Sequence, residues 1–315
     1  MPENNSFIVA TRGSLLALAQ TRQTVFAIQK QYPESKFEII QFSTLGDKVT
    51  DKPLINFGGT GVFVKELENA LIKHEADFAI HSLKDIPNNI PDGLILASFP
   101  KREKANDLFL TQNNKSIFEM PQGFKCGTGS PRRIIQLMKL RPDAQFSDLR
   151  GNIDTRLHKL AEGKYDAIIL AAAGMIRLGK KFSNTAIIPL KYLLPAICQG
   201  AIAIECRKDD NKTIQTIKKI NDYETEIAVK TERVFMAAIE GGCKFPLAAY
   251  AKVSGNNVLL DVLAGQLSTG KYIRKVEETN IEKTFDLAKR MANQLIEDCQ
   301  KQNIKLFNYT GNEIK

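Results

Sequence analysis

A cysteine in a glycine-rich turn is the residue of this sequence whose surroundings most favour reactivity. Cys243 follows two glycines in the run EGGCKFP at 240–246. The glycines let the backbone bend sharply and keep side-chain bulk away from the sulfur, and Lys244 favours the nucleophilic thiolate. The turn therefore predicts a thiol that can carry a covalent group. A free cysteine just after an apolar helix is also commonly an inert core residue, so this turn alone leaves both interpretations open.

Arginines recur at places where a strand-like run passes into a helical one. Arg12 follows the strand-like run 7–10, and Ser14 is expected to cap the next helix. Ser130 is expected to cap another helix, whose first turn contains Arg132 and Arg133. In open α/β sheets, ligands bind outside the carboxyl ends of the strands, where helix N-termini present N–H groups to anions. A cation at a helix N-terminus interacts unfavourably with the helix dipole, at a cost of about 0.3 to 1 kcal/mol. A bound anion interacts favourably with both the dipole and the cation.

Two further junctions repeat the pattern. Arg150 and Arg156 flank the start of another helix, and Arg177 follows the strand-like run 166–173. Any one of these arginines could simply be solvated, because most arginines are exposed. Four such junctions favour a multiply anionic ligand, and the guanidinium fork suits carboxylates and phosphates alike.

One carboxylate accompanies these cations. Asp85 follows Lys84 directly after the strand-like run 77–83. An aspartate shortly before a proline, here Pro87, is also a common turn residue. Surrounded by positive charge, Asp85 should stay ionised, and it could stabilise a cation that forms during a reaction.

The sequence lacks the motifs of several other chemistries. The five cysteines are odd in number and form no C-x-x-C pair, and the three histidines are scattered, which argues against a disulfide framework and a metal centre. The glycine-rich run 58–61 lacks the G-K-[ST] ending of a P-loop, so a flexible loop or lid is the better interpretation. Neither a G-x-S-x-G nor an H-E-x-x-H motif occurs.

The net charge of +9 indicates an anionic partner. The sequence has no basic tail, no block of lysine and arginine and no basic stretch interleaved with aromatics, so nucleic acid is not favoured. Its first residues do not form an export signal, and the longest apolar run, 167–176, is too short to cross a bilayer. We therefore expect a cytoplasmic protein without a membrane partner.

The order of strand-like and helical runs predicts an α/β fold with an α+β C-terminal part. At 315 residues the chain is long enough for two or three domains. Strand-like and helical runs alternate up to about residue 206, a polar connection is expected at 207–213, and the strands of the last region are grouped between two helices. Hairpin turns are expected at Asn256–Asn257 and Thr269–Gly270. The expected strands include 7–10, 36–43, 77–83, 94–99, 144–149, 166–173, 201–206, 247–253, 258–267 and 272–277, and the expected helices include 14–30, 62–73, 134–140, 155–160, 223–239 and 282–301.

Six motifs together closely resemble those of the hydroxymethylbilane synthase family, also called porphobilinogen deaminase. They occur in the family's order and spacing, and the resemblance covers nearly the whole chain. The motifs are ATRGS at 10–14, LALAQ at 16–20, HSLKD at 81–85, LRGN at 149–152, DAIILAAAG at 166–174 and EGGC at 240–243.

The resemblance implies a reaction. Members of the family make the linear tetrapyrrole hydroxymethylbilane from porphobilinogen, releasing ammonia, on a dipyrromethane primer held by a thioether to the cysteine that matches Cys243. The acetate and propionate groups of these pyrroles are then the anions that the arginines hold. Loss of the amine leaves an azafulvene-like electrophile with positive charge on the pyrrole nitrogen. The resemblance makes Asp85 the catalytic carboxylate that steadies this charge, through its own charge or by transferring a proton.

The resemblance also implies a set of site residues, and no metal among them. Thr60 and Phe63 match a lid position and an aromatic position near the cofactor. The residues that match cofactor-binding positions are Cys243, Lys84, Asp85, Ser130, Arg132, Arg133, Arg150 and Arg156, and those that match substrate-binding positions are Arg12, Gln20, Arg150, Arg156 and Arg177.

The family fold has two α/β domains that resemble periplasmic binding proteins, with the active site between them, and a smaller α+β domain that presents the cysteine. By this resemblance we expect domain 1 at 1–100 with 200–218, domain 2 at 101–199 and domain 3 at 219–315. The chain is thus expected to cross back into domain 1 after residue 200.

Three departures from the family pattern stand out. Thr60 replaces a lysine in the loop at 58–61, which removes a cation from a loop that grips carboxylates. Cys198 stands where glycine is usual, and the run at 129–131 replaces a Ser-Ser-Leu run. We expect altered loop mobility or rate, with the reaction kept.

A second function class fits the same junctions. Two α/β lobes with anion-binding edges could form a binding protein for a small polycarboxylate, without catalysis, and Cys243 would then be structural. In either case we expect a monomer.

Overall fold

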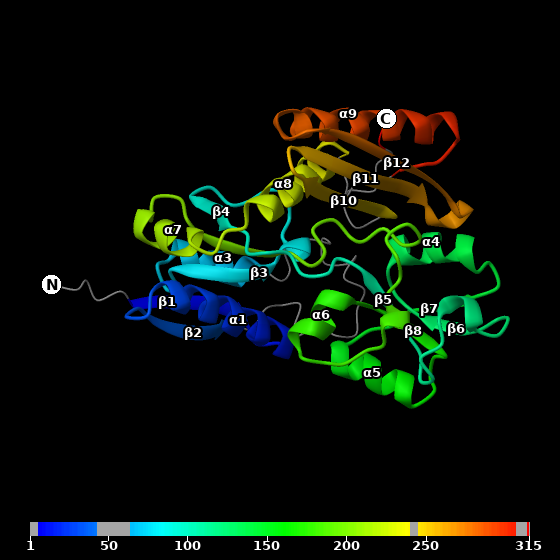
Figure 1. Ribbon diagram of the computed structural model, residues 1–315, viewed down its shortest axis with the longest axis horizontal. Coiled ribbons are helices and arrows are strands. Elements are labelled where there is room, and N and C mark those ends of the chain that lie inside the picture. Colours follow the sequence, from blue (N-terminus) through cyan, green and yellow to red (C-terminus); the bar gives the residue numbers. More distant parts are fainter. Residues whose placement is uncertain (1–5, 43–63, 240–244, 307–313, 315) are drawn as a thin grey trace. The chain divides into compact units, whose positions relative to one another are not determined.

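The computed structural model describes residues 6–42, 64–239, 245–306 and 314. The chain forms two compact units. Unit 1 consists of Met1–Glu103 and Ala201–Glu226, and unit 2 consists of Lys104–Gly200 and Ile227–Lys315. The strands of the described residues form three sheets, which Figure 1 shows with their helices.

Unit 1 is built on a mixed five-stranded sheet in the order β2-β1-β3-β9-β4. Its strands are β1 (Ser6–Arg12), β2 (Lys36–Phe42), β3 (Phe78–Ser82), β4 (Leu94–Ser98) and β9 (Ile202–Arg207). Strand β1 runs parallel to β2 and β3, whereas β9 is antiparallel to β3 and β4. The return of β9 into this sheet brings residues more than a hundred positions apart in the sequence into register.

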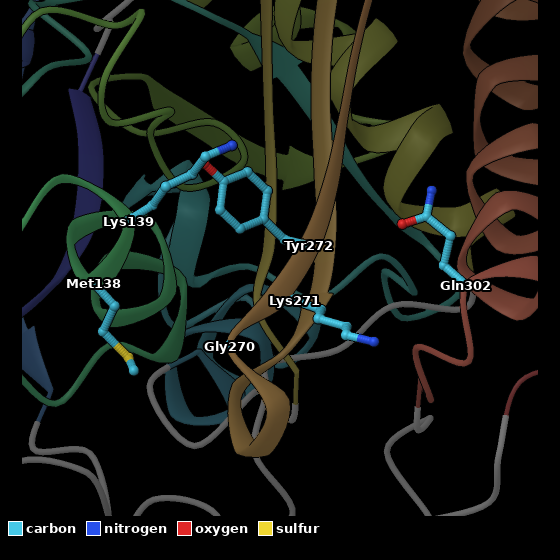
Figure 2. Close-up of a pocket in the computed structure, with 6 residues that line it drawn as sticks. All are labelled: Met138, Lys139, Gly270, Lys271, Tyr272 and Gln302. Carbon is cyan, nitrogen blue, oxygen red and sulfur yellow. The ribbon is translucent and has the colours of Figure 1, made fainter. Parts of the chain in front are cut away.

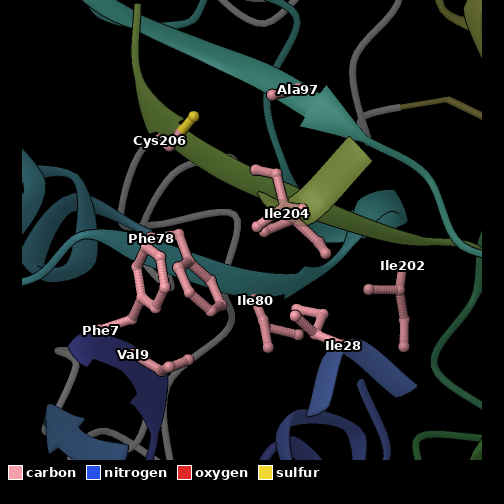
Figure 3. Close-up of a cluster of buried hydrophobic side chains, with 10 residues drawn as sticks. Phe7, Val9, Ile28, Phe78, Ile80, Ala97, Ile202, Ile204 and Cys206 are labelled. Atoms are coloured by element: carbon pink, nitrogen blue, oxygen red, sulfur yellow. The ribbon is translucent and has the colours of Figure 1, made fainter. Parts of the chain in front are cut away.

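The alternation of β3 side chains explains how helices cover both faces of this sheet. Phe78 and Ile80 join a core cluster with Ile28 of α1 (Leu15–Gln31) and Ile217 of α7 (Asn211–Lys218), as Figure 3 shows for most of its members. Ala79 lies in a second cluster with residues of α3 (Lys65–Ile72). Successive strand residues face opposite sides, so α1 and α7 cover one face and α3 covers the other.

Unit 2 contains a four-stranded sheet in the order β5-β8-β6-β7. Here β6 (Lys125–Gly127) is parallel to β7 (Gln145–Ser147) and β8 (Ala167–Ala171), and β5 (Asp107–Leu110) is antiparallel to β8. Ile168 and Leu170 pack with Leu160 of α5 (Ile153–Ala161), whereas Ile169 packs with Leu137 of α4 (Pro131–Leu140) on the other face. A short helix, α6 (Ala172–Arg177), follows β8 directly.

The third sheet is an antiparallel meander in unit 2. It consists of β10 (Leu247–Ser254), β11 (Asn257–Gln266) and β12 (Lys271–Asn280), and α9 (Thr284–Lys301) packs against β11 and β12 (Figure 1). Helix α8 (Tyr223–Ala238) precedes it in the chain. The first hairpin turn is Gly255–Asn256, one residue earlier than predicted, because Ser254 pairs with Asn257. Gly255 has φ +58, a conformation that glycine adopts without strain.

The predicted fold class is confirmed: two α/β sheets are followed by a smaller α+β part. The polar connection expected at 207–213 is wrong, because β9 extends to Arg207 and α7 begins at Asn211. Asp210 caps α7 by accepting a hydrogen bond from Thr213 N at 3.0 Å. Its polar outer face concealed this short helix, which buries only Thr213, Thr216 and Ile217. The division into three domains stays a prediction.

Candidate functional site

The carboxyl edge of the unit 1 sheet carries the first group of predicted residues. Since β1 and β3 are parallel neighbours, both end at this edge. Arg12 is the last residue of β1, and Lys84 and Asp85 lie in the 3₁₀ turn Leu83–Asp85 that follows β3. Ser14 caps α1 as predicted, with its Oγ accepting a hydrogen bond from Ala17 N at 3.2 Å.

The turn that carries Asp85 is anchored on both sides. Leu83 N donates to Ala201 O at 3.1 Å, and Ile86 N donates to Leu83 O at 3.1 Å. The side chains of Leu83 and Ile86 are buried, whereas Asp85 is half-buried. The carboxylate of Asp85 makes no hydrogen bond or ion pair with any residue that the structure describes.

Gln20 is buried in α1 and reaches the end of β3. Its Nε2 lies 2.9 Å from Ser82 Oγ. This contact fixes the start of α1 beside the Asp85 turn, and it uses part of the amide that the sequence assigned to a ligand.

A buried polar cluster lies in the same sheet, just before the Asp85 turn. His81 Nε2 is 3.0 Å from Glu205 Oε2, and both side chains are almost fully buried. Burial, with a contribution from Glu205, raises the pKa of Glu68 on α3 to about 7, against smaller opposing effects of His81 and Lys65. These acidic residues were not predicted, because they come together only when β9 inserts beside β3.

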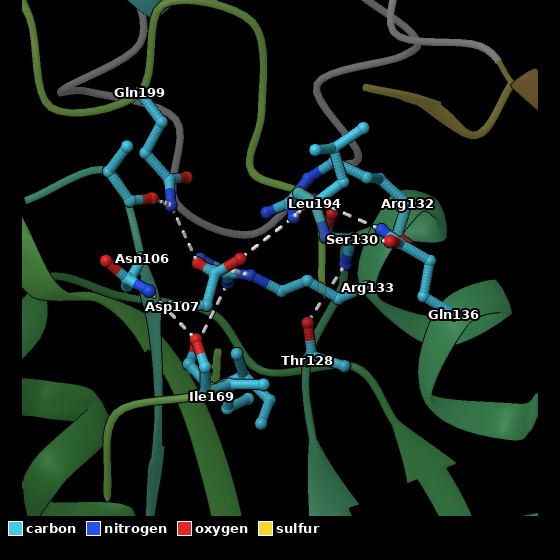
Figure 4. Close-up of polar contacts among 12 residues, drawn as sticks. Asn106, Asp107, Thr128, Ser130, Arg132, Arg133, Gln136, Ile169, Leu194 and Gln199 are labelled. Atoms are coloured by element: carbon cyan, nitrogen blue, oxygen red, sulfur yellow. Dashed lines mark hydrogen bonds and ion pairs between the residues drawn. The ribbon is translucent and has the colours of Figure 1, made fainter. Parts of the chain in front are cut away.

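The carboxyl edge of the four-stranded sheet in unit 2 carries the second group. Helix α4 follows β6 and begins at Pro131, as the sequence predicts. Ser130 occupies the N-cap position, but its side chain makes no capping hydrogen bond, so the predicted serine cap is confirmed in position only. Arg132 and Arg133 lie in its first turn, but they are only 5% and 8% exposed. Both turn into the protein toward Asp107, the fully buried first residue of β5 (Figure 4).

Asp107 is the common hydrogen-bond and ion-pair partner of three polar side chains at this edge. Its Oδ1 accepts hydrogen bonds from Arg133 Nη2 at 2.7 Å and Arg133 Nε at 3.1 Å. Gln199 Nε2 donates to the same oxygen at 3.0 Å, and Arg132 Nη1 forms an ion pair with Oδ2 at 2.8 Å. The two arginines also donate to main-chain carbonyls, Arg132 to Leu194 O at 2.6 Å and Arg133 to Ile169 O at 3.0 Å.

The charges of this group do not balance. Burial alone would raise the pKa of Asp107, but Arg132 and Arg133 hold it well below its usual range. Burial lowers the pKa of Arg132, and Asp107 partly offsets this effect. One carboxylate thus faces two guanidinium groups, which leaves one positive charge for an anion. Sequence reasoning missed Asp107; a lone acidic residue opening the apolar strand DLFL was the available signal.

Arg150 and Arg156 extend the positive charge along this edge. Arg150 Nε is 2.5 Å from Asp148 Oδ2, and Arg156 Nε donates to Gly151 O at 2.7 Å. Burial lowers the pKa of Arg156, and Arg133 and Arg150 lower it further, against the opposing effect of Asp148. Gly151 has φ +108, which explains the glycine between Arg150 and the N-cap Asn152.

Arg177 contacts the loop that precedes β9. At the end of α6, Arg177 Nη2 donates to Gly200 O at 2.6 Å. In the same loop Cys198 is buried with φ +59, and its N–H donates to Glu232 Oε2 at 2.6 Å. A left-handed backbone favours glycine, which is a physical reason for glycine to be usual at this position.

The structure therefore brings together the predicted residues of each unit separately. Cys243, Thr60 and Phe63 lie outside the described residues. Among the described residues, no group of His, Cys, Asp and Glu is arranged to hold a metal ion, and no helix is long and apolar enough to cross a membrane.

A cavity of about 490 Å³ lies elsewhere in unit 2 (Figure 2). Lys139 of α4 lies over the ring of Tyr272 of β12, with 5.2 Å between Nζ and the ring centroid. Among the described residues, those that line this cavity are Met138, Lys139, Gly270, Lys271, Tyr272 and Gln302, and no predicted site residue is one of them.

The chain is similar to known proteins along most of its length. Residues 7–215 match the family model described as porphobilinogen deaminase, dipyromethane cofactor binding domain, and residues 226–297 match the model of its C-terminal domain. A porphobilinogen deaminase of Brevibacillus brevis is 47% identical over 249 residues, which cover 79% of this chain and 81% of that one. One of Desulforamulus reducens is 41% identical over 288 residues, covering 91% and 93%. Among solved structures, the methionine binding protein MetQ matches with a TM-score of 0.42 and 11% identity, over 69% of this chain and 90% of that one.

Proposed function

Because the chain belongs to the porphobilinogen deaminase family, we infer that it is a hydroxymethylbilane synthase, a transferase that joins porphobilinogen units head to tail into a linear tetrapyrrole and releases ammonia. The observation that carries this inference is the match of both family models, one after the other, from residue 7 to residue 297. Binding of a polycarboxylate without catalysis is not favoured, since the relatives that align over most of the chain are named as the enzyme.

The chain contains a dipyrromethane cofactor-binding domain, and its residues fit that group. Pyrroles with acetate and propionate side chains need several cationic donors, and the unit 2 edge supplies Arg132, Arg133, Arg150 and Arg156. Nε and Nη2 of Arg132 form no hydrogen bond within the described part of the chain, so they are available to a carboxylate. When bound, dipyrromethane supplies the pyrrole chain to which new units are added.

We propose that Cys243 holds the cofactor through a thioether. Its two preceding glycines and the neighbouring Lys244 support a reactive thiolate. Three other cysteines, Cys126, Cys206 and Cys299, are buried, and burial raises the pKa of each thiol to about 12. Those three are poor nucleophiles, which supports Cys243 as the attachment point.

The cations are proposed to orient carboxylates rather than to take part in bond making. Their positive charge, held at strand ends, fixes the pyrrole rings and excludes competing orientations. We assign Lys84, Ser130, Arg132, Arg133, Arg150 and Arg156 to the cofactor, and Arg12, Gln20, Arg150, Arg156 and Arg177 to porphobilinogen.

Asp85 is proposed as the catalytic residue. Its carboxylate is half-buried, sits on an anchored turn and has no partner among the described residues, so it can accept hydrogen bonds from pyrrole N–H groups. A fixed negative charge there stabilises the positive charge that develops on the substrate nitrogen as the amine departs.

Further properties of the enzyme are proposals from the sequence. We propose a cytoplasmic monomer whose small-molecule partner is porphobilinogen, with no nucleic-acid or membrane partner. Thr60 and Phe63 are proposed to lie near the bound pyrroles, and Thr60 to give its loop a weaker grip on carboxylates than a lysine would.

The function is tested by product analysis. Purified protein incubated with porphobilinogen should release one ammonia for each porphobilinogen consumed, and mass spectrometry should detect the linear tetrapyrrole. Binding of porphobilinogen without ammonia release would contradict the enzymatic function and would favour the non-catalytic binding protein instead.

A further inference from the structure

Asp107 is a buried carboxylate to which neither the motifs nor the proposed reaction assign a role. We propose that Asp107 is a positioning residue, which orients Arg132 and Arg133 and cancels one of their charges so that Arg132 presents Nε and Nη2 to a pyrrole carboxylate. The inference rests on the proposed function, because the carboxylate is that of dipyrromethane or of porphobilinogen.

The hydrogen bonds divide the two arginines into different roles. All three side-chain nitrogens of Arg133 are engaged, Nε and Nη2 by Asp107 and Nη1 by Ile169 O. Within the described part of the chain, Arg132 makes contacts through Nη1 alone, with Asp107 and with Leu194 O. Arg133 is therefore anchored in the protein, whereas Arg132 keeps two nitrogens for a ligand (Figure 4).

Asp107 also connects these arginines to the loop before β9. Gln199 Nε2 donates both to Asp107 Oδ1 at 3.0 Å and to Ala105 O at 2.7 Å. The next residue, Gly200, offers its carbonyl to Arg177. Asp107 is thus linked to a third arginine, Arg177, through Gln199 and the main chain of this loop.

The charge at this edge matters as well as the geometry. Without Asp107, two adjacent buried guanidinium groups would repel each other, and no other acidic residue of the described chain forms an ion pair with them. With Asp107, the pair carries one net positive charge, which suits one carboxylate. A role limited to this neutralisation would be structural, so the test must separate positioning from folding.

Two substitutions at Asp107 separate these roles. Asp107→Asn keeps the approximate shape and removes the charge, whereas Asp107→Glu keeps the charge and moves the oxygens by one methylene. A matched control is Asp261→Asn, which breaks a paired contact with Arg274, 2.9 Å from Nε and 2.5 Å from Nη2, in the three-stranded sheet. Each folded variant is compared with the parent for adduct content by denatured intact mass, and for KM and kcat per adduct-bearing molecule.

We expect both Asp107 variants to raise KM for porphobilinogen about 10- to 100-fold or to lower the adduct fraction, because contacts of charged groups are worth about that much. A lower adduct fraction is the result expected from the assignment of Arg132 to the cofactor, and a change in KM alone would move that assignment to the substrate. The kcat should stay within about threefold, since a carboxylate away from the reacting atoms is held equally before and during reaction. Asp261→Asn should change only thermal stability.

Parent values of KM and adduct fraction in either folded Asp107 variant would overturn the proposal, and so would a fall in kcat alone. If Asp107→Asn does not fold, Asp107→Glu decides by the same criteria. A parent protein that carries no adduct and releases no ammonia would instead contradict the proposed function, before any variant is considered.

Discussion

Each of the two α/β sheets has an aspartate at its carboxyl edge, Asp85 in unit 1 and Asp107 in unit 2, and the two side chains have opposite surroundings. Asp85 follows β3 in unit 1, is half-buried, and has no partner among the described residues. Asp107 opens β5 in unit 2, is fully buried, and contacts two arginines and a glutamine. Both lie where parallel strands end, so the topology is shared and the surroundings differ.

The contacts of a buried carboxylate decide whether it can take part in chemistry directly. Burial with two guanidinium groups fixes the charge of Asp107 and uses its oxygens, so it can act only through its neighbours. The turn that carries Asp85 is anchored through its main chain, and the Asp85 carboxylate has no partner among the described residues, which is why we propose that it contacts the substrate. We therefore expect substitutions at Asp85 to act on turnover and substitutions at Asp107 to act on stability and binding.

The largest expected effect is at Asp85. Asp85→Ala should lower kcat at least about 100- to 1000-fold if, as we propose, the fixed charge of Asp85 stabilises the developing cation. Thermal stability and adduct content should stay at parent values. Asp92→Ala, at an exposed aspartate of the same unit, should leave turnover unchanged. Near-normal turnover of Asp85→Ala would remove the distinction between the two carboxylates.

The next effect is the stability cost at Asp107. Asp107→Asn should lower the free energy of unfolding by about 3 to 5 kcal/mol, because it leaves buried guanidinium charges unpaired. Urea denaturation of parent and variant measures this difference. Asp148→Asn, which breaks the more exposed pair with Arg150, should cost about 1 kcal/mol or less. Equal losses in the two variants would contradict the role given to burial.

A smaller effect concerns the loop that connects Asp107 to β9. Since Cys198 has φ +59, Cys198→Gly should be more stable than Cys198→Ala by about 1 kcal/mol, the reverse of the usual order. The comparison removes the sulfur in both variants, so it isolates the backbone strain. At Cys126 in strand β6, alanine should be the more stable replacement. If alanine were the more stable replacement at Cys198 as well as at Cys126, the predicted backbone strain at Cys198 would be contradicted.

The smallest effect is a pH dependence of unit 1. Burial raises the pKa of Glu68 to about 7 from 4.5, so the folded protein holds a proton that the unfolded chain releases. Its contribution to stability is complete below pH 4.5 and is lost as the pH rises toward about 7. The melting temperature should therefore fall over this range in the parent and fall less in Glu68→Gln. Glu75→Gln, at an exposed position, should behave like the parent; a parent-like slope in Glu68→Gln would contradict the assignment.

Local signals in the sequence predicted much of this arrangement. The cap at Ser14, the helix start at Pro131 and the arginines after strands all depend on residues a few positions apart. The partners of Asp107 could not be predicted in this way, because Arg133 and Gln199 lie 26 and 92 positions from it. His81 and Glu205 likewise meet only through the return of β9. The left-handed backbone at Cys198 could not be predicted from a cysteine, because this residue type does not favour it. The one available signal was that the family usually has glycine at this position.

The central proposal is that pyrroles grow on Cys243, that the arginines hold their carboxylates and that Asp85 stabilises the positive charge formed during each step. Its most direct test is the denatured intact mass of cofactor-replete protein, measured for the parent, Cys243→Ala and the buried control Cys299→Ala. The account predicts an excess mass of one dipyrromethane unit in the parent and in Cys299→Ala, and an unmodified mass in Cys243→Ala. An unmodified parent, or an adduct that survives the loss of the Cys243 sulfur, would contradict it.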